Sequence, residues 1–424
     1  MNGEMDEMNP ESDVDHYDAN MRLSAAGPRY RTTRGRGRVL AICAVATSGA
    51  LVLAACSSGS DKPAAASDAI SATTLASLRT VIARAERAPQ WAAPGPAVSA
   101  SVLHGKSALV MPVNDQIDAC HTQALDFQQL GRQLGMNVTL YDDVGVPAQW
   151  AAGIQQASSK HDNAIALICG IVPQAVAPQL AAAQHAGMAV VDGNYNETSY
   201  YTGLDGETAV NTAQGITDDV DDAILQLDGK PLHALVVSSD SIIQGPEAAA
   251  AATNEVNRLC PATCSVENLV VPIQDWATQV QGEVHQDLVS HPDVNAVIIV
   301  FDGMVQFAIP AVQQVRRPGL QIYTWGASRT VESYMLQKGS LIAADPGPDE
   351  TWDAYEAMDQ VIRLLSGHPA ASVNAEFDPN RFWTPENVAA FFGPGGSYGN
   401  EGYNGTQFIN GFRHLWGLSP ASGS

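Results

Sequence analysis

The sequence predicts an α/β protein of two Rossmann-like lobes, each built on a parallel sheet. From Lys106 onward, short apolar runs alternate with segments of helical period. The alternation pauses near residues 195–206 and then resumes. Glycines such as Gly135 and Gly187 fall near the expected helix ends, where a positive φ favours glycine. Strands that alternate with helices form βαβ units, and both faces of such a parallel sheet are covered.

The expected strands are short apolar runs, as is typical of buried parallel strands. They are residues 108–113, 138–141, 164–169, 188–191, 232–237, 269–271, 296–301 and 320–324. Helical spacing between them predicts helices at about residues 118–135, 148–160, 173–187, 207–227, 246–259, 276–290, 304–316, 329–338 and 349–366.

Residues 1–55 are predicted to be a lipoprotein signal segment. A run of arginines precedes the apolar, uncharged residues 39–55, as in a secretory signal. A membrane-spanning helix is disfavoured, because it needs about 20 apolar residues. Leu53-Ala54-Ala55-Cys56 resembles the bacterial lipobox. The resemblance implies cleavage before Cys56 and lipid on its sulfur, and several acyl chains would give lasting attachment.

Residues 56–104 are predicted to be a tether that carries a short helix. Residues 57–68 are rich in Ser and Ala, which is typical of a flexible linker. Apolar residues at helical spacing then predict an amphipathic helix that ends before Pro89.

The composition excludes some classes of partner. The formal net charge is −23, and nearly all of it lies after residue 55. This acidity argues against nucleic acid and against direct adhesion to anionic lipid. A hydrophobic content of 45% and a mean hydropathy of −0.06 fit a globular protein.

Four cysteines remain after Cys43 and Cys56 are assigned to the signal and the lipid anchor. They are Cys120, Cys169, Cys260 and Cys264. An even number in an exported chain predicts two disulfides. Cys260 and Cys264 would close a small ring. A metal-binding pair is the alternative, but no matching Cys or His pair lies nearby in the sequence.

Residues 375–424 differ from the rest, since they are rich in Phe, Trp, Gly and Asn. We expect an irregular C-terminal extension whose aromatic side chains pack onto one lobe. A surface for a ligand or a partner is the alternative.

Several segments resemble the type I periplasmic binding proteins, specifically the ribose-type sugar-binding branch. The opening strand ends in Asn114-Asp115, residues 181–192 match the family's A-x-x-A-G-I-P-V segment, and residues 290–297 match its HPDVxAV segment. Gly203-Leu204-Asp205 matches the first crossover between lobes, and residues 323–326 stand where the family has V-G-F/W-D.

The resemblance implies two lobes joined by three crossovers, near residues 203–205, 343–345 and 374–377. It also implies hinge closure around a small ligand, which is delivered to an ABC-type permease. The expected domains are a signal segment at 1–55, a tether at 56–104, the N-lobe at 105–203, the C-lobe at 204–344, a returning N-lobe helix at 345–374 and the extension at 375–424.

In open α/β sheets the ligand lies beyond the carboxyl ends of the strands. Asn114, Asp115 and Gln116 follow the first strand, and capping of the next helix is their alternative role. Asp192 and Asn194 follow the fourth strand. The resemblance implies that Asp192 accepts hydrogen bonds from sugar hydroxyls, and a hinge-loop carboxylate is the alternative.

Six further ligand-binding candidates follow strands of the second lobe: Asp240, Gln244, Phe301, Asp302, Trp325 and Asp345. Compared with the family pattern, Gln244 stands roughly where a ligand-holding Arg is found, and Trp325-Gly326 replaces an aromatic-Asp pair. Phe301 and Trp325 would offer flat apolar faces to a sugar ring or to an aromatic ligand. These departures argue against an ordinary pentose or hexose.

Cys120 falls in the first turn of the helix after the first strand, and Cys169 ends the third strand; the strand order implied by the resemblance makes those two strands neighbours. A disulfide between them, beside the ligand cleft, is therefore predicted, and free buried thiols are the alternative.

No G-x-S-x-G, HExxH, P-loop or kinase motif occurs, so we expect no enzyme, no cofactor and no metal site. The sequence predicts a monomeric extracytoplasmic solute-binding protein, anchored through lipid on Cys56, that serves an ABC transporter. The alternative is a receptor lipoprotein that presents its ligand to a membrane signalling protein.

Overall fold

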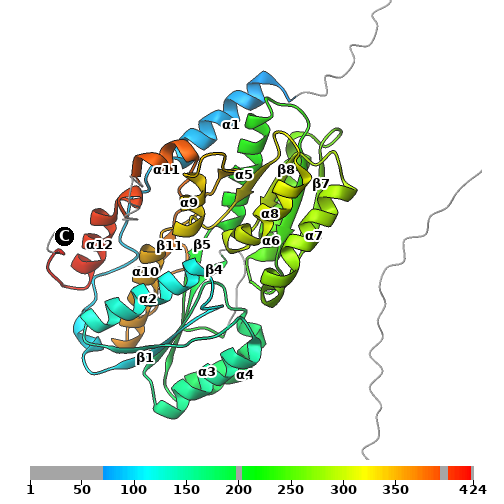
Figure 1. The fold of residues 1–424 in the computed structure, drawn as a ribbon. Helices are drawn as coiled ribbons and strands as arrows, with labels where there is room; N and C mark the ends of the chain where they lie inside the picture. Colours follow the sequence, from blue (N-terminus) through cyan, green and yellow to red (C-terminus); the bar gives the residue numbers. More distant parts are fainter. Residues whose placement is uncertain (1–69, 197–202, 392–399, 422–424) are drawn as a thin grey trace, which may run out of the picture. The chain divides into compact units, whose positions relative to one another are not determined.

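A computed structural model describes residues 70–196, 203–391 and 400–421 (Figure 1). The predicted signal segment and Cys56 lie outside these ranges. In the described chain the expected fold class is confirmed, because two parallel sheets are covered by helices on both faces.

The N-lobe is built on a six-stranded sheet in the order β11-β5-β4-β3-β1-β2, and its paired strands run parallel. The strands are β1 (Ser107–Pro112), β2 (Asn137–Leu140), β3 (Ala164–Ile168), β4 (Ala189–Asn196), β5 (Gly206–Val210) and β11 (Phe377–Asp378). β1 and β3 are buried almost throughout, which explains their continuous apolar runs.

The C-lobe repeats the same doubly wound topology in a five-stranded parallel sheet, ordered β10-β9-β8-β6-β7. Its strands are β6 (His233–Ser238), β7 (Ser265–Val270), β8 (Ala296–Ile299), β9 (Gln321–Thr324) and β10 (Ile342–Ala344). In both lobes the first strand lies between the second and the third, so the chain winds outward in both directions from the middle of the sheet.

Helices cover both faces of each sheet. In the N-lobe, α2 packs beside α10, and α3 packs beside α4 across the sheet (Figure 1). In the C-lobe, α5 pairs with α6 and α7 pairs with α8. The α-helices are α1 (Ala72–Ala85), α2 (Asp118–Gln133), α3 (Pro147–Lys160), α4 (Ala177–His185), α5 (Thr212–Gln226), α6 (Gly245–Leu259), α7 (Trp276–Ser290), α8 (Val305–Val315), α9 (Arg329–Met335), α10 (Glu350–Leu365), α11 (Pro385–Phe391) and α12 (Gly405–Leu415). Short 3₁₀ turns are η1 (Ala100–Leu103), η2 (Pro173–Val176), η3 (Ile273–Asp275), η4 (Asp302–Met304) and η5 (Asn400–Tyr403).

The segment expected as a helix at residues 207–227 begins instead as strand β5. Its helix, α5, starts only after Asn211, whose side chain accepts a hydrogen bond from the Gln214 N–H at 2.8 Å. β5 pairs with β4 in the N-lobe sheet, so the chain changes lobe after Val210 rather than at residue 204. Glu207 and Thr208 interrupt the apolar run, and the sequence pattern therefore lacked a strand signal.

The C-terminal extension packs chiefly on α10, as its aromatic content led us to expect, but it is not irregular, because it adds β11 to the N-lobe sheet and forms α11 and α12. Phe408 lies 4.6 Å from Trp352, and Trp416 stacks on Tyr355 at 5.4 Å, measured between ring centroids. On the outer side, the connector after α1 joins the same cluster, since Val98 N–H donates to a carbonyl in α12. α10 is thus covered by α2, α12 and the sheet (Figure 1), and its residues from Glu350 to Arg363 are nearly all buried.

Both predicted disulfides are present. Cys120, in the first turn of α2, is bonded to Cys169 at the end of β3. Cys260 is bonded to Cys264 across the turn between α6 and β7. This pairing replaces the metal-pair alternative for Cys260 and Cys264.

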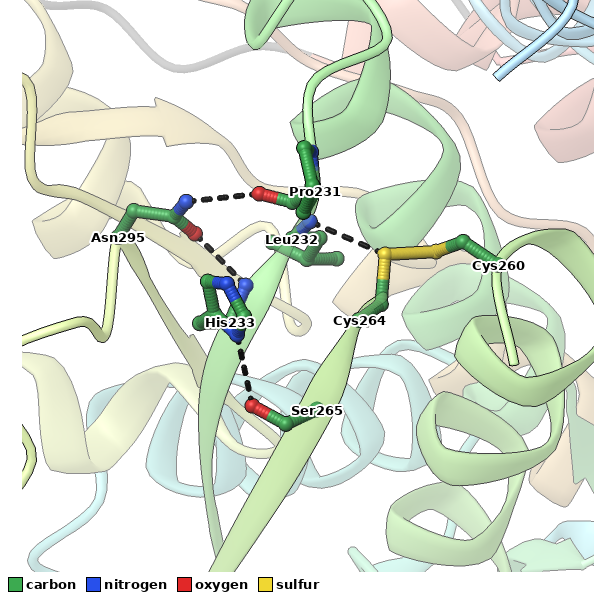
Figure 2. Close-up of a disulfide and its surroundings, with 7 residues drawn as sticks. All are labelled: Pro231, Leu232, His233, Cys260, Cys264, Ser265 and Asn295. Carbon is green, nitrogen blue, oxygen red and sulfur yellow. Dashed lines mark hydrogen bonds between the residues drawn. A yellow bond between two sulfur atoms is a disulfide. The ribbon is translucent and has the colours of Figure 1, made fainter. Parts of the chain in front are cut away.

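Figure 2 shows how the second disulfide anchors the start of β6. The Cys264 Sγ accepts a hydrogen bond from the Leu232 N–H at 3.1 Å. Asn295 holds the same turn from the other side, because its amide donates to Pro231 O at 2.9 Å and accepts from His233 N–H at 2.9 Å. This disulfide therefore fixes the start of β6. It lies at the amino ends of the strands, whereas the residues between the lobes lie at the carboxyl ends.

Candidate functional site

Two adjoining cavities lie between the lobes, at the carboxyl ends of the strands. The larger has a volume of about 260 Å³ and the smaller about 60 Å³. Their linings share residues from the start of α2 in the N-lobe and from the β8–α8 connection in the C-lobe. This is the place where open parallel α/β sheets bind their ligands.

The C-lobe supplies an aromatic wall. Phe301 follows β8, Trp325 follows β9, and Trp276 begins α7. The Trp276 and Phe301 rings are stacked at 6.2 Å, and Trp325 meets Phe301 edge-on at 6.3 Å. Each indole N–H already has a partner, Val271 O for Trp276 and Asn380 Oδ1 for Trp325. The three rings therefore contribute apolar surface to the cavity rather than donors.

Asp302 is the carboxylate of this wall and lines both cavities. It accepts a hydrogen bond from the Ser328 N–H at 2.8 Å. Burial raises the pKa of its carboxyl to about 6, against the lowering effect of the Ser328 hydrogen bonds. Gly326 makes room for it, since a Cβ there would lie 2.3 Å from the Asp302 Cγ.

The N-lobe supplies carboxylates from the start of α10. Glu350 and Asp353 line the smaller cavity. Glu350 is only 5% exposed, and its Oε1 has no hydrogen-bond partner among the residues that the structure describes. Burial raises the pKa of the Glu350 carboxyl well above its usual value, and the charge of Asp349 adds to this. Arg329 acts in the opposite direction as a smaller effect.

The lobes touch directly around these cavities. Thr330 Oγ1 of α9 donates to Asp118 Oδ2 of α2 at 2.7 Å. Ile243 N–H of the C-lobe donates to Gly170 O of the N-lobe at 3.3 Å. The amide of Gln244 packs on the same glycine, where a Cβ would lie 2.4 Å from Oε1. The Cys120–Cys169 disulfide lines the smaller cavity beside this contact.

The structure brings six of the candidate residues to the cavity walls: Asn114, Gln116, Gln244, Phe301, Asp302 and Trp325. The Asn114 side chain also shapes its own loop, since Oδ1 accepts from Gln116 N–H at 2.9 Å. This bond lies within the loop before α2 and does not cap that helix, whose N-cap residue is Ile117.

The other candidates line neither cavity. Asp115 is paired with His121, 2.9 Å from its Nδ1, and Asp240 is exposed. Asp345 is fully buried after β10 and accepts from the Ala327 N–H at 3.0 Å. The side chain of Asn194 falls outside the described residues.

Asp192 lies inside the N-lobe and not on the cavity wall. β4 continues to Asn196, five residues beyond its expected end, so Asp192 lies within the strand opposite Glu207 of β5. Burial, followed by the charge of Glu207, raises the pKa of Asp192 well above its usual value. Both of its carboxylate oxygens are without a hydrogen-bond partner in the described chain.

The sequence analysis missed Trp276, Glu350 and Asp353. Glu350, Asp353, Glu356 and Asp359 recur at every third position of α10, and all four are buried. A carboxylate series of that kind on a helix is ordinarily solvated. The packing of α2, α12 and the N-lobe sheet around α10 buries it, and the sequence pattern carries no signal for those contacts.

No family model and no curated protein matches the chain. Solved structures do. An ABC sugar transporter subunit from Rhodobacter sphaeroides 2.4.1 aligns with a TM-score of 0.58 at 17% identity, covering 67% of this chain and 99% of its own. A myo-inositol binding protein from Caulobacter, bound to myo-inositol, aligns with a TM-score of 0.59 at 14% identity, covering 67% of this chain and 95% of its own. The chain has the type I periplasmic binding protein fold.

A third structure of this fold is an ABC transporter solute-binding protein from Mycobacterium smegmatis with bound glycerol. It aligns with a TM-score of 0.58 at 16% identity, over 69% of this chain and 99% of its own. The Rhodobacter and Mycobacterium neighbours are ABC transporter components, and the Caulobacter neighbour is a binding protein. At this level of identity the agreement concerns the fold, which the two sheets and their common strand order also define.

Metal binding and membrane crossing were the other two possibilities for the described ranges. Within residues 70–196, 203–391 and 400–421, no group of three or more His, Cys, Asp or Glu side chains is arranged to hold a metal ion. The helices in those ranges include none that is both long and apolar enough to cross a bilayer.

Proposed function

We propose that this chain is an extracytoplasmic solute-binding protein that captures a small polar molecule between its lobes for an ABC transporter. The ligand class is a sugar, a related polyol or a molecule that carries an aromatic or charged group. No catalytic residue is assigned.

The observation that supports this proposal most strongly is the composition of the cavity walls. Residues from both lobes line one continuous region, so a ligand there contacts both lobes at once. Amides such as Gln116 and Gln274 offer donors and acceptors, and Phe301 and Trp325 offer flat faces. A mostly apolar concave site with a few polar groups is typical of small-molecule recognition.

The structural neighbours support the polar ligand class. Solved structures of this fold contain bound glycerol, myo-inositol and allitol. These are small neutral polyols, and the amide side chains of the present cavities suit hydroxyl groups of that kind.

Anchoring is the second part of the proposal. Lipid on Cys56 would hold the protein at the outer face of the membrane, and residues 57–69 would act as its tether. A ligand captured between the lobes would then stay near a permease.

A thermal-shift screen of the mature protein tests the binding function. The compounds are sugars, polyols, nucleosides, aromatic acids and small amines. We expect at least one compound to raise the melting temperature with a saturable dose dependence, since a ligand of the folded state stabilises it by mass action. If no compound in any class raised it, the binding function would be contradicted.

A further inference from the structure

Carboxyl groups gather around the two cavities. Four carboxylates line them: Asp118, Asp302, Glu350 and Asp353. Among the described residues, neither lining includes a Lys or an Arg. Arg329 is close enough to lower the pKa of the Glu350 carboxyl, but it is not part of either wall.

A buried carboxylate without a cationic partner is unfavourable, because it loses its hydration without gaining an ion pair. At the smaller cavity the Glu350 Oε1 is buried and has no hydrogen-bond partner in the described chain, and the nearby charge of Arg329 offsets only part of the cost of burial. Asp302 faces the same cavity from the opposite lobe and has only backbone and hydroxyl donors among the groups that stabilise its charge. A ligand that enters there meets carboxyl groups from both sides.

The aromatic wall also favours a positively charged ligand. The faces of Phe and Trp rings carry partial negative charge and attract cations, most strongly where water is excluded. Trp276, Phe301 and Trp325 form one cluster that lines the cavity together with the carboxylates. Aromatic rings and carboxylates around one small space are the combination that recognises ammonium groups.

We propose that the ligand is an organic cation, a primary amine or a quaternary ammonium group on a small polar body, held between Phe301 and Trp325 on one side and Asp302 and Glu350 on the other. This inference rests on the proposed binding function. The amides of Gln116, Gln244 and Gln274 then contact the polar body of the ligand.

The test is isothermal titration of the mature protein with matched pairs of probes. One pair is choline and its neutral isostere 3,3-dimethyl-1-butanol, and the other is D-glucosamine and D-glucose. In at least one pair we expect the cationic member to bind about 10- to 100-fold more tightly, through charge-assisted hydrogen bonds for the glucosamine ammonium or through cation–π and carboxylate attraction for choline, which has no N–H to donate. If a neutral member bound as tightly as its cationic partner, or a neutral sugar or polyol were the best ligand of the wider screen, the inference would be overturned while the binding function stood.

A different result would contradict both the binding function and the inference of a cationic ligand. If neither pair gave heat and no compound of the thermal-shift screen raised the melting temperature, the binding function and this inference would fall together. If the screen found only a nucleoside or an aromatic acid without a positive charge, only the inference would fall.

Two substitutions on α10 test whether Glu350 recognises the charge of the ligand or only supports the fold. Glu350→Gln keeps the size of a side chain that lines the cavity, whereas Glu356→Gln makes the same change at a buried residue that lines neither cavity. Both variants should fold, because each replaces a buried carboxyl whose pKa is raised by burial with a neutral amide of the same size. We expect Glu350→Gln to weaken the cationic probe about 10-fold or more, as expected for a charge-assisted bond, and Glu356→Gln to leave its affinity unchanged. Equal affinities of the two variants for the cationic probe would overturn the assignment of Glu350.

Discussion

The two lobes have the same strand order but present different chemistry to the cleft between them. The C-lobe contributes a cluster of aromatic rings, Trp276, Phe301 and Trp325. The N-lobe contributes the carboxylates of α10 and the Cys120–Cys169 disulfide. Topology thus determines where the site lies, because both sheets end at the same cleft. The loops after the strands and the returning helix α10 determine what the site can bind.

The two disulfides give the largest expected difference between the lobes. Replacing Cys120 and Cys169 together with Ala should lower the free energy of unfolding by about 4 kcal/mol, because the bond closes a loop of roughly 50 residues in the unfolded chain. The matched change at Cys260 and Cys264 releases a much shorter loop and should lower it by about 2 kcal/mol. Urea denaturation at fixed pH measures both. Equal losses would contradict this account.

The buried carboxyls predict a pH dependence of stability. Burial raises the pKa of Asp349 to about 7 and that of Asp302 to about 6. Between the unfolded value near 4 and these folded values, the folded state binds more protons, so stability falls as the pH rises. We expect the free energy of unfolding to drop by on the order of 2–4 kcal/mol between pH 5 and pH 8.

The variant Asp349→Asn tests how much Asp349 contributes to this pH dependence of stability. Asp349 caps α10 by accepting from the Trp352 N–H at 2.9 Å, and Asn can make the same cap. The variant should therefore fold and show a smaller loss of stability between pH 5 and pH 8. A profile that rose with pH in the parent protein would contradict the prediction.

Much of the fold could be predicted from the sequence, because buried parallel strands have continuous apolar runs such as residues 108–113. β5 was missed because Glu207 and Thr208 break its run. Asp192 was expected beyond a strand end, but β4 continues past it as a result of pairing with β5. These errors arise from contacts between distant segments, which the local pattern does not contain.

The candidate site was predicted in part for the same reason. Phe301 and Trp325 follow apolar strands almost directly, and Gln244 ends the loop after β6, so their position at the cleft could be inferred from the chain alone. Glu350 and Asp353 begin a helix that returns from the other lobe, and their burial depends on α2 and α12 packing around it. No spacing rule in the sequence distinguishes them from solvated carboxylates.

The aromatic wall predicts a smaller effect on binding. Trp325→Leu removes a ring face, whereas Trp325→Phe keeps one, and both lose the hydrogen bond to Asn380. We expect the leucine variant to weaken the binding of a cationic probe by about 5- to 30-fold, as for a desolvated cation–π contact of about 1–2 kcal/mol. The phenylalanine variant should retain most of the affinity. Titration calorimetry measures the affinity of both variants for the probe. Equal losses of affinity would assign the effect to the Asn380 hydrogen bond instead of the ring face.

The smallest expected effect on affinity comes from outside the lobes. Replacing Cys56 with Ala should leave ligand binding unchanged and release the protein from the membrane fraction into the soluble one. Fractionation of the expressing host with immunodetection measures the release. If membrane attachment survived the substitution, lipid on Cys56 would be contradicted.

Native mass spectrometry of the protein purified from its own host tests the central claim most directly, since it detects a ligand captured between the lobes. The account predicts one small organic molecule per chain, released when the lobes unfold and carrying an amine or a quaternary ammonium group. Only the mass of the chain itself, in spectra that preserve non-covalent complexes of a control binding protein, would contradict the claim that this cleft captures a solute.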